Sequence, residues 1–257
     1  MIELFDSHAH LNNEKFIDDL DEVILRAATN QVSFILNVGW DIESSKKAVE
    51  LAEKYPNQYA AVGIHPHDAE DYGEMEERIL EHLAANKKVV AIGETGLDYY
   101  RNLSPKEVQR DAFKRQIALA KRVKKPLIIH DRDAHQEVME ILKEEKASEV
   151  GIVLHCFSGS SQMALECIKM GWFISLAGPV TYPNAVKPVQ VAEVVPIDKL
   201  FIETDCPYLG PQSVRGKRNE PANVKHVAEK IAQVRKKTIE EIAYHTTENA
   251  KKFFKIS

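Results

Sequence analysis

Short apolar runs rich in β-branched residues alternate along this chain with segments of helical periodicity. Eight such runs cover residues 2–8, 32–39, 59–65, 88–94, 126–130, 151–157, 172–178 and 200–205. Helical segments cover 14–29, 42–55, 73–87, 105–124, 133–146, 160–170, 185–194, 222–235 and 238–254. Strict strand–helix alternation predicts a parallel sheet with right-handed crossovers. Eight repeats of it predict an α/β fold, a closed (β/α)8 TIM barrel.

No linker, low-complexity tract or repeat divides the pattern, so we expect one domain over residues 1–257. An open doubly wound sheet is the alternative fold. Its glycine-rich turn, G-x-G-x-x-G, is missing after the first strand. The pattern therefore favours the barrel.

Composition and charge limit the class of protein and its expected location. Hydrophobic residues make up 44% of the 257 and charged residues 28%, as in an ordinary globular enzyme. The first strand begins too close to Met1 for a signal peptide, and no apolar stretch is long enough to cross a bilayer. We therefore expect a cytoplasmic protein that does not contact membranes. A net charge of −5 argues against general coating of nucleic acid but allows a local basic site.

Residue types that bind metals recur near the ends of the apolar runs. His8 and His10, at positions i and i+2 of the first strand, point the same way. Carboxylates and further imidazoles follow at the ends of strands four, five, six and eight, namely Glu94, His130, His155 and Asp205. Active sites of TIM barrels lie at this rim. We therefore expect these six residues to form a metal centre.

The donor set also constrains the metals. Imidazole and carboxylate together suit divalent Zn, Mn, Co, Fe or Ni, and carboxylate also suits Mg. Six ligands exceed the needs of one tetrahedral zinc. We expect two ions about 3.5–4 Å apart with Glu94 as the bridging carboxylate.

Six segments of the chain, in order, resemble the signature segments of the TatD family of metal-dependent deoxyribonucleases, which belong to the amidohydrolase-like barrels. The segments are FDSHAHL from residue 5, GIHPH from 63, GETGLD from 93, PLIIHDR from 126, HCFSG from 155 and ETDCP from 203. The resemblance implies that His8, His10, Glu94, His130, His155 and Asp205 are the ligands of a two-metal centre, with Glu94 as the bridge. It also implies deoxyribonuclease activity.

Catalytic roles can be assigned to two of the expected ligands and to one further histidine. We expect Glu94, Asp205 and His65 to be the catalytic residues: Asp205 ligates one metal and accepts a proton, and His65 hydrogen-bonds the phosphate or leaving group. Arg132 shares strand parity with His130 and could clamp a phosphate. A basic cluster after the eighth strand, on the active rim, adds the substrate-binding residues Arg215, Lys217 and Arg218.

Three classes of function stay open from sequence. The favoured one is a phosphodiester hydrolase that trims ends of DNA or acts on single strands, with no obligatory protein partner. The second is a two-metal amide or ester hydrolase, such as a deacylase of a small or aminoacyl substrate. The third, a non-catalytic metal-binding protein, fits poorly with an intact ligand set that retains His65.

Overall fold

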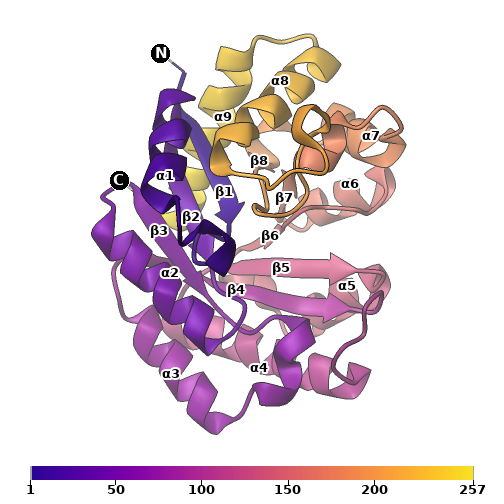
Figure 1. Cartoon of the computed structure of the whole chain (residues 1–257). Coiled ribbons are helices and arrows are strands. Elements are labelled where there is room, and N and C mark those ends of the chain that lie inside the picture. The colour runs from indigo at the N-terminus through magenta and orange to yellow at the C-terminus, as the bar shows by residue number, and fades with distance from the viewer. Residues whose placement is uncertain (1, 257) are drawn as a thin grey trace. The chain divides into compact units, whose positions relative to one another are not determined.

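The computed structural model describes residues 2–256 and shows the expected alternation of strands and helices (Figure 1). The eight strands belong to one sheet whose spatial order follows the chain, β1 to β8. The fold is therefore the (β/α)8 TIM barrel predicted from the sequence. The domain expected over residues 1–257 includes two residues, 1 and 257, that lie outside the described part.

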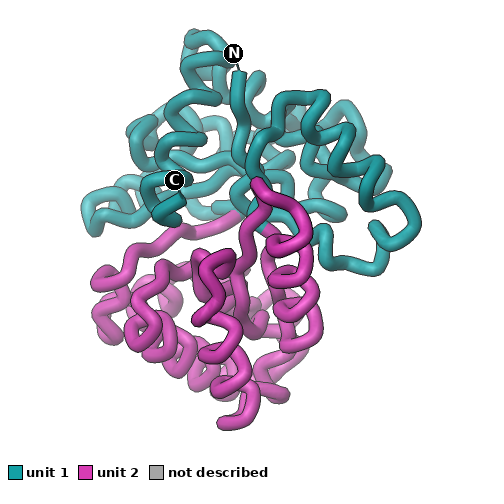
Figure 2. Tube along the Cα trace, turned by 90° about the vertical axis from the view of Figure 1, so that its left-hand side faces the viewer, with its two compact units in different colours: residues 1–36, 156–257 teal, residues 37–155 magenta. Residues whose placement is uncertain are grey.

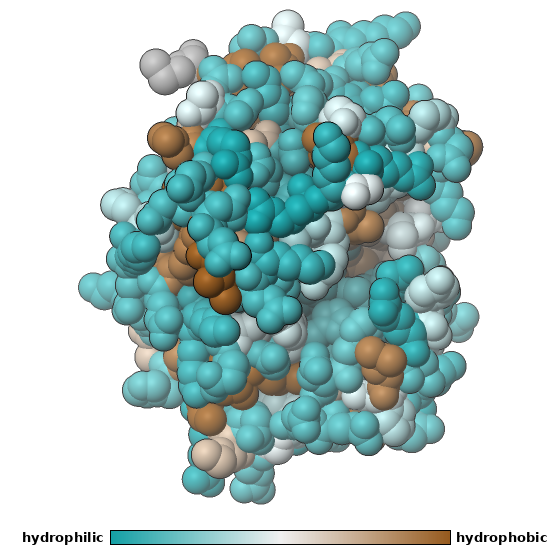
Figure 3. All heavy atoms as spheres, viewed as in Figure 1, coloured by the Kyte–Doolittle hydropathy of each residue, from teal (hydrophilic) through white to brown (hydrophobic). Residues whose placement is uncertain are grey.

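The chain divides into two compact units (Figure 2). Unit 1 comprises the chain up to Leu36 and from Cys156 onward, and unit 2 comprises Asn37–His155. None of the helices within residues 2–256 combines the length and apolar character that crossing a bilayer requires. Hydrophilic residues predominate on the face shown in Figure 3, where apolar residues form only small scattered groups.

Unit 2 contains strands three to six with the helices that connect them. Buried strand β4 pairs in parallel with β3 and β5, and α2 and α4 pack against β3 and β4 (Figure 1). Helix α2 begins at a reciprocal capping box. The side chain of Asp41 accepts a hydrogen bond from the Ser44 amide, and the Ser44 hydroxyl accepts one from the Asp41 amide. The elements are α2 (Ile42–Lys54), β3 (Gln58–Val62), α3 (Glu74–Ala84), β4 (Val89–Asp98), α4 (Lys106–Val123), β5 (Leu127–Arg132), α5 (His135–Glu144) and β6 (Ile152–Leu154).

Unit 1 contains the first and last strands of the barrel. An aromatic cluster in which Phe201 contacts Phe173, Phe253 and Phe254 packs α9 against β7 and β8. Thr238 caps α9 by accepting from the Glu241 amide. The elements are β1 (Leu4–Ala9), α1 (Leu20–Thr29), β2 (Val32–Val38, which begins here), α6 (Ser161–Lys169), β7 (Phe173–Leu176), α7 (Val186–Val194), β8 (Leu200–Ile202), α8 (Val224–Arg235) and α9 (Ile239–Phe254).

Two boundaries differ from the prediction for a physical reason. The helix expected over 14–29 is split into a short 3-10 helix, Glu14–Phe16, and α1, because the backbone at Asp19, with φ −140° and ψ 27°, is not helical. Strand β4 extends beyond the expected 88–94 to Asp98. Glu94 and Asp98 in this strand are buried and held by side-chain hydrogen bonds, so the apolar pattern ends before the strand does.

We predict that Gly96, where β4 meets β5, tolerates no side chain. It has a φ of 145°, and a Cβ there would lie 2.0 Å from the carbonyl oxygen of His130. Gly96→Ala should therefore lower the free energy of unfolding by about 4 kcal/mol through backbone strain and overpacking. Gly171→Ala is the control, because Gly171 also has a positive φ, 84°, but nothing lies within 4 Å of its Cβ position.

Urea denaturation of both variants measures the two losses. The control should lose about 1–2 kcal/mol. Equal losses in the two variants would contradict the close approach of β4 and β5 at Gly96.

Candidate metal centre

Glu94 of β4 is the centre of a cluster of buried imidazoles in unit 2. Its Oε1 lies 2.7 Å from Nδ1 of His130, on β5, and 2.7 Å from Nε2 of His155, directly after β6. Nε2 of His65, after β3, lies 3.6 Å from the same oxygen. Only 4% of Glu94 is exposed to solvent. Consecutive strand ends of unit 2 thus bring four of the expected site residues together.

The charges in this cluster depend on one another. Burial alone would raise the pKa of Glu94, but His155, His65 and a hydrogen bond with His130 hold that pKa well below its usual range. Burial, together with the nearby His130, lowers the pKa of His65 well below its usual value. Burial also acts to lower the pKa of His130, but hydrogen bonds to Asp98 and Glu94 raise it. The carboxylates thus favour positive charge here, which either protons or metal ions can supply.

Asp98 and His67 extend the cluster, and the sequence interpretation missed both. Oδ2 of Asp98 lies 2.9 Å from Nε2 of His67 and 3.2 Å from Nε2 of His130. Burial alone would raise the pKa of Asp98, but hydrogen bonds from His130, the Arg101 amide and His67 lower it. Asp98 lies four residues after Glu94 on the same strand, so strand parity could have indicated its direction.

Two buried glutamines of α4 hold the strand ends that carry these groups. Gln116 accepts from the amide of Ile64 (2.8 Å) and donates to its carbonyl oxygen (2.9 Å), directly before His65. Gln109 accepts from the amide of Asp98 (2.9 Å) and donates to its carbonyl oxygen (3.2 Å). Positions 109 and 116 are two helical turns apart and share one face of α4. This helix therefore fixes the backbone on both sides of the imidazole cluster.

A second cluster, in unit 1, contains His8, His10 and Asp205. The Nε2 atoms of the two histidines are 3.2 Å apart. Oδ1 of Asp205 lies 3.3 Å from Nε2 of His10 and 3.8 Å from Nε2 of His8. Asp6, whose pKa burial raises to about 8, accepts from the amide and hydroxyl of Thr204 and so ties β1 to the segment before Asp205.

Short strands explain how Asp205 reaches this cluster. Strand β8 ends at Ile202, so Asp205 lies in a loop and not at the strand end expected from the apolar run. Its φ of 55° places it in the left-handed region, which aspartate adopts more readily than most residues. The Asp205 amide donates to the carbonyl oxygen of His8 at 2.9 Å. The turn therefore holds the carboxylate beside the two histidines.

Both clusters fit divalent metal ions by their chemistry. In unit 2, ligand atoms of His65, Glu94 and His130 lie within 4.8 Å of one another. In unit 1, two imidazole nitrogens and a carboxylate oxygen converge from two strand ends. Mixed imidazole and carboxylate donors of this kind are typical of zinc, iron, manganese and related ions.

The expected substrate-binding cations lie in different environments. The guanidinium of Arg132 stacks over Tyr100, 4.1 Å from the ring centroid, and that of Arg215 stacks over Tyr182 at 4.4 Å. Lys217 is exposed. Stacked guanidinium groups stay available to phosphates, because the ring engages only one face.

Arg218 differs from the other cations. Both of its terminal nitrogens bind Asp19, at 2.7 and 2.6 Å, and Nη1 also donates to the carbonyl oxygen of Lys15 at 2.6 Å. Hydrogen bonds from Arg218 and Arg26 lower the pKa of Asp19 to about 2. The charge of Arg218 is therefore compensated within the protein.

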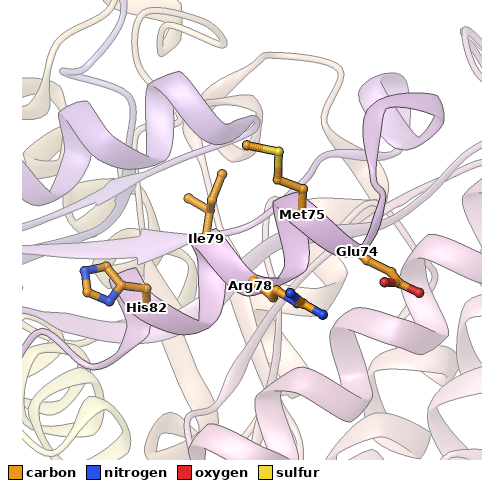
Figure 4. Close-up of a pocket in the computed structure, with 5 residues that line it drawn as sticks. All are labelled: Glu74, Met75, Arg78, Ile79 and His82. Atoms are coloured by element: carbon orange, nitrogen blue, oxygen red, sulfur yellow. The ribbon is translucent and has the colours of Figure 1, made fainter.

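Four further histidines lie in helices α3, α5, α8 and α9. One of them, His82, borders a surface hollow of about 460 Å3 on α3 (Figure 4). The hollow is lined by Glu74, Met75, Arg78, Ile79 and His82, none of which was expected in the site. His135 is bonded to Asp131 at 2.7 Å and is half-buried.

Comparison with known proteins places the chain among metal-dependent hydrolases. It is 53% identical over 254 residues to an uncharacterized metal-dependent hydrolase, YabD, of Bacillus subtilis, with 99% of this chain and 100% of the relative covered. It is 36% identical to a protein of Citrobacter rodentium named 3'-5' ssDNA/RNA exonuclease TatD, with 99% and 98% covered.

A solved structure and a family model agree with these relatives. The crystal structure of YJJV, a TatD homologue from Escherichia coli K12, superposes with a TM-score of 0.93 at 31% identity, covering 99% of this chain and 98% of that one. The model of the family described as TatD related DNase matches residues 5–255. The chain therefore belongs to the TatD related DNase family of metal-dependent hydrolases.

Proposed function

We propose that this protein is a cytoplasmic two-metal phosphodiester hydrolase that removes nucleotides from the ends of single-stranded nucleic acid, DNA above all. The observation that carries the proposal is the buried Glu94 carboxylate, whose Oε1 lies 2.7 Å from ring nitrogens of both His130 and His155. Oε1 of this carboxylate faces both imidazoles, and Oε2 would be left to hold a second ion. Relatives 36% identical to this chain are named 3'-5' ssDNA/RNA exonuclease, which supports a nucleic-acid substrate.

The ligands in this proposal are the six residues expected from sequence: His8, His10, Glu94, His130, His155 and Asp205. Two divalent ions, when bound, would lower the pKa of water and neutralise charge on the phosphate oxygens. Asp205 would accept the proton of the attacking water, because its carboxylate is only partly buried and lies beside His10. His65, buried and neutral, would hydrogen-bond the phosphate or the leaving oxygen.

Substrate binding in this proposal relies on Arg132, Arg215 and Lys217. All three are exposed, and two of them stack on tyrosines. Arg218 would act indirectly, by anchoring the loop that carries the other two. No membrane or obligatory protein partner is required by this reaction.

We predict that the protein reconstituted with Mn2+ releases mononucleotides from a single-stranded oligonucleotide, and that Glu94→Gln reduces the rate at least about 1,000-fold. An amide has half the charge-bearing oxygens of a carboxylate and cannot hold two cations. Chromatography of the released nucleotides measures both rates. Glu77→Gln is the control, because Glu77 is a carboxylate of the same unit that pairs with Arg115 and Arg122.

Near-normal nucleotide release by Glu94→Gln would contradict the role of Glu94 as a bridge. Hydrolysis of a panel of small esters and amides without release from oligonucleotides would replace the proposed nuclease with an amide or ester hydrolase.

Asp98 should act on the metal site through His130. We predict that Asp98→Asn weakens divalent-metal binding by about 10–100-fold, because an amide has a single acceptor oxygen and cannot serve both the imidazoles now bound to Oδ2 and the Arg101 amide now bound to Oδ1. Competition with a chelator measures the affinity. Asp131→Asn is the matched control, since Asp131 bonds to His135 at 2.7 Å and not to the cluster. Equal metal retention by the two variants would show that Asp98 serves only the fold.

The cations of the loop after β8 should differ in their contribution to binding. We predict that replacing both Arg215 and Lys217 by alanine makes oligonucleotide binding less dependent on salt. The slope of log affinity against log salt concentration should become shallower by about 0.7 for each phosphate contact that is lost. Arg218→Ala should leave the slope within error of wild type if the loop keeps its place. Fluorescence anisotropy titrations at several salt concentrations give the slopes. Unchanged slopes in the double variant would exclude this loop from the phosphate path.

A further inference from the structure

Unit 1 contains a small apolar pocket that none of the site residues above lines. Its volume is about 270 Å3. The walls are apolar, the exposed Lys187 stands at its edge, and no carboxylate is among the lining residues. Those residues are Cys156, Phe157, Ser158, Leu176, Ala177, Pro179, Val180, Lys187 and Pro188.

The pocket is formed by the segments that follow β6 and β7. The amide of Cys156 donates to Oε1 of Glu203 at 2.6 Å, and the amide of Glu203 donates to the carbonyl oxygen of Leu176 at 3.1 Å. Glu203 precedes the proposed ligand Asp205 by two residues, and Cys156 directly follows the proposed ligand His155. The walls of the pocket are therefore tied to the strand ends that carry the proposed metal site.

The aromatic wall is held in place before any ligand arrives. A Cβ added at Gly159 would lie 2.6 Å from Cζ of Phe157, so the backbone at Gly159 packs directly against this ring. The Phe157 amide donates to the carbonyl oxygen of Ser175 at 3.0 Å. A fixed ring loses little conformational entropy when another planar group packs on it.

One cation lines the pocket and a second lies near one of its walls. Lys187 is among the lining residues. The short 3-10 helix Gly178–Thr181, which supplies Pro179 and Val180, is followed by Tyr182, over which the Arg215 guanidinium stacks at 4.4 Å. An apolar slot beside two cations suits a planar apolar group that carries an anionic substituent. The base of a nucleotide with its phosphate is such a group.

We propose that this pocket binds the base of the terminal nucleotide, with Phe157 as its stacking surface, and that Lys187 contacts the adjacent phosphate. The volume lies just below the ~300–1,000 Å3 of sites for drug-sized ligands, which suits one base and not two. Stacking on a ring is tolerant of sequence, because every base has a π-face. The proposal rests on the proposed function, since it names the part of the substrate that this side of the site would recognise.

The test compares two hydrolysis-resistant phosphorothioate oligonucleotides on the Mn2+-loaded protein. One carries a normal 3'-terminal nucleotide, and the other carries an abasic deoxyribose there. Wild type should bind the base-bearing end about 10-fold more tightly, as expected for one stacked base. Phe157→Leu should lose this preference and leave the affinity for the abasic end unchanged.

Several outcomes would overturn the proposal. Equal affinity of the wild-type protein for the base-bearing and abasic ends would contradict base binding in this pocket. This comparison needs no variant, so it holds even if Phe157→Leu fails to fold. If Phe157→Leu lowers the affinity for both oligonucleotides by the same factor, the Phe157 ring has only a structural role. Because binding is measured on uncleavable substrates, a base preference without nucleotide release from ordinary oligonucleotides supports the pocket and contradicts the proposed nuclease.

Lys187→Gln tests the phosphate contact separately. It should weaken binding of both ends alike, about 3- to 10-fold at moderate salt, and lower the salt slope by about 0.7. Lys169→Gln is the matched control, because Lys169 is exposed at the last residue of α6, away from the pocket lining. Equal effects of the two lysine variants would remove Lys187 from the proposal.

Discussion

The burial of the Glu94 carboxylate is the constraint on which the site depends. A charged carboxylate that is 4% exposed is costly to take out of water unless cations or hydrogen-bond donors surround it. His130 and His155 lie at 2.7 Å, and His65 lies at 3.6 Å. The cluster therefore holds its negative charge only together with positive charge. This balance favours the binding of metal ions and makes the removal of any partner expensive.

In the barrel, hydrogen bonds and close packing hold the backbone segments that carry the site residues. The α4 glutamines, Gln109 and Gln116, each make two hydrogen bonds to the backbone of a strand end. Gly96 allows β4 and β5 to approach, where a side chain would meet the carbonyl oxygen of His130. In unit 1, the left-handed turn at Asp205 holds the carboxylate of the second cluster in place. The geometry of both clusters thus depends on helix and strand residues outside them.

Sequence patterns predicted the strands and pointed to residues that lie in the two clusters, because these residues lie near the carboxyl ends of strands even where the strand and the apolar run end at different positions. They missed Asp98 because a buried polar strand has no apolar pattern, so β4 seemed to end at Glu94. They also treated Arg218 as a free cation, since its partner Asp19 lies 199 positions away in the chain. Pairing over such distances is set by the tertiary fold. The pocket beside Phe157 was missed for the same reason, because its walls come from the loop after β6, from the end of β7 with the segment after it, and from α7.

Anomalous diffraction from crystals grown with Mn2+ tests the central claim, a two-metal centre built on Glu94, most directly. A centre bridged by Glu94 would give two strong peaks about 3.5–4 Å apart. Each should lie at bonding distance from a different oxygen of the Glu94 carboxylate. A single peak at full occupancy, or a second peak remote from Glu94, would contradict the bridged centre.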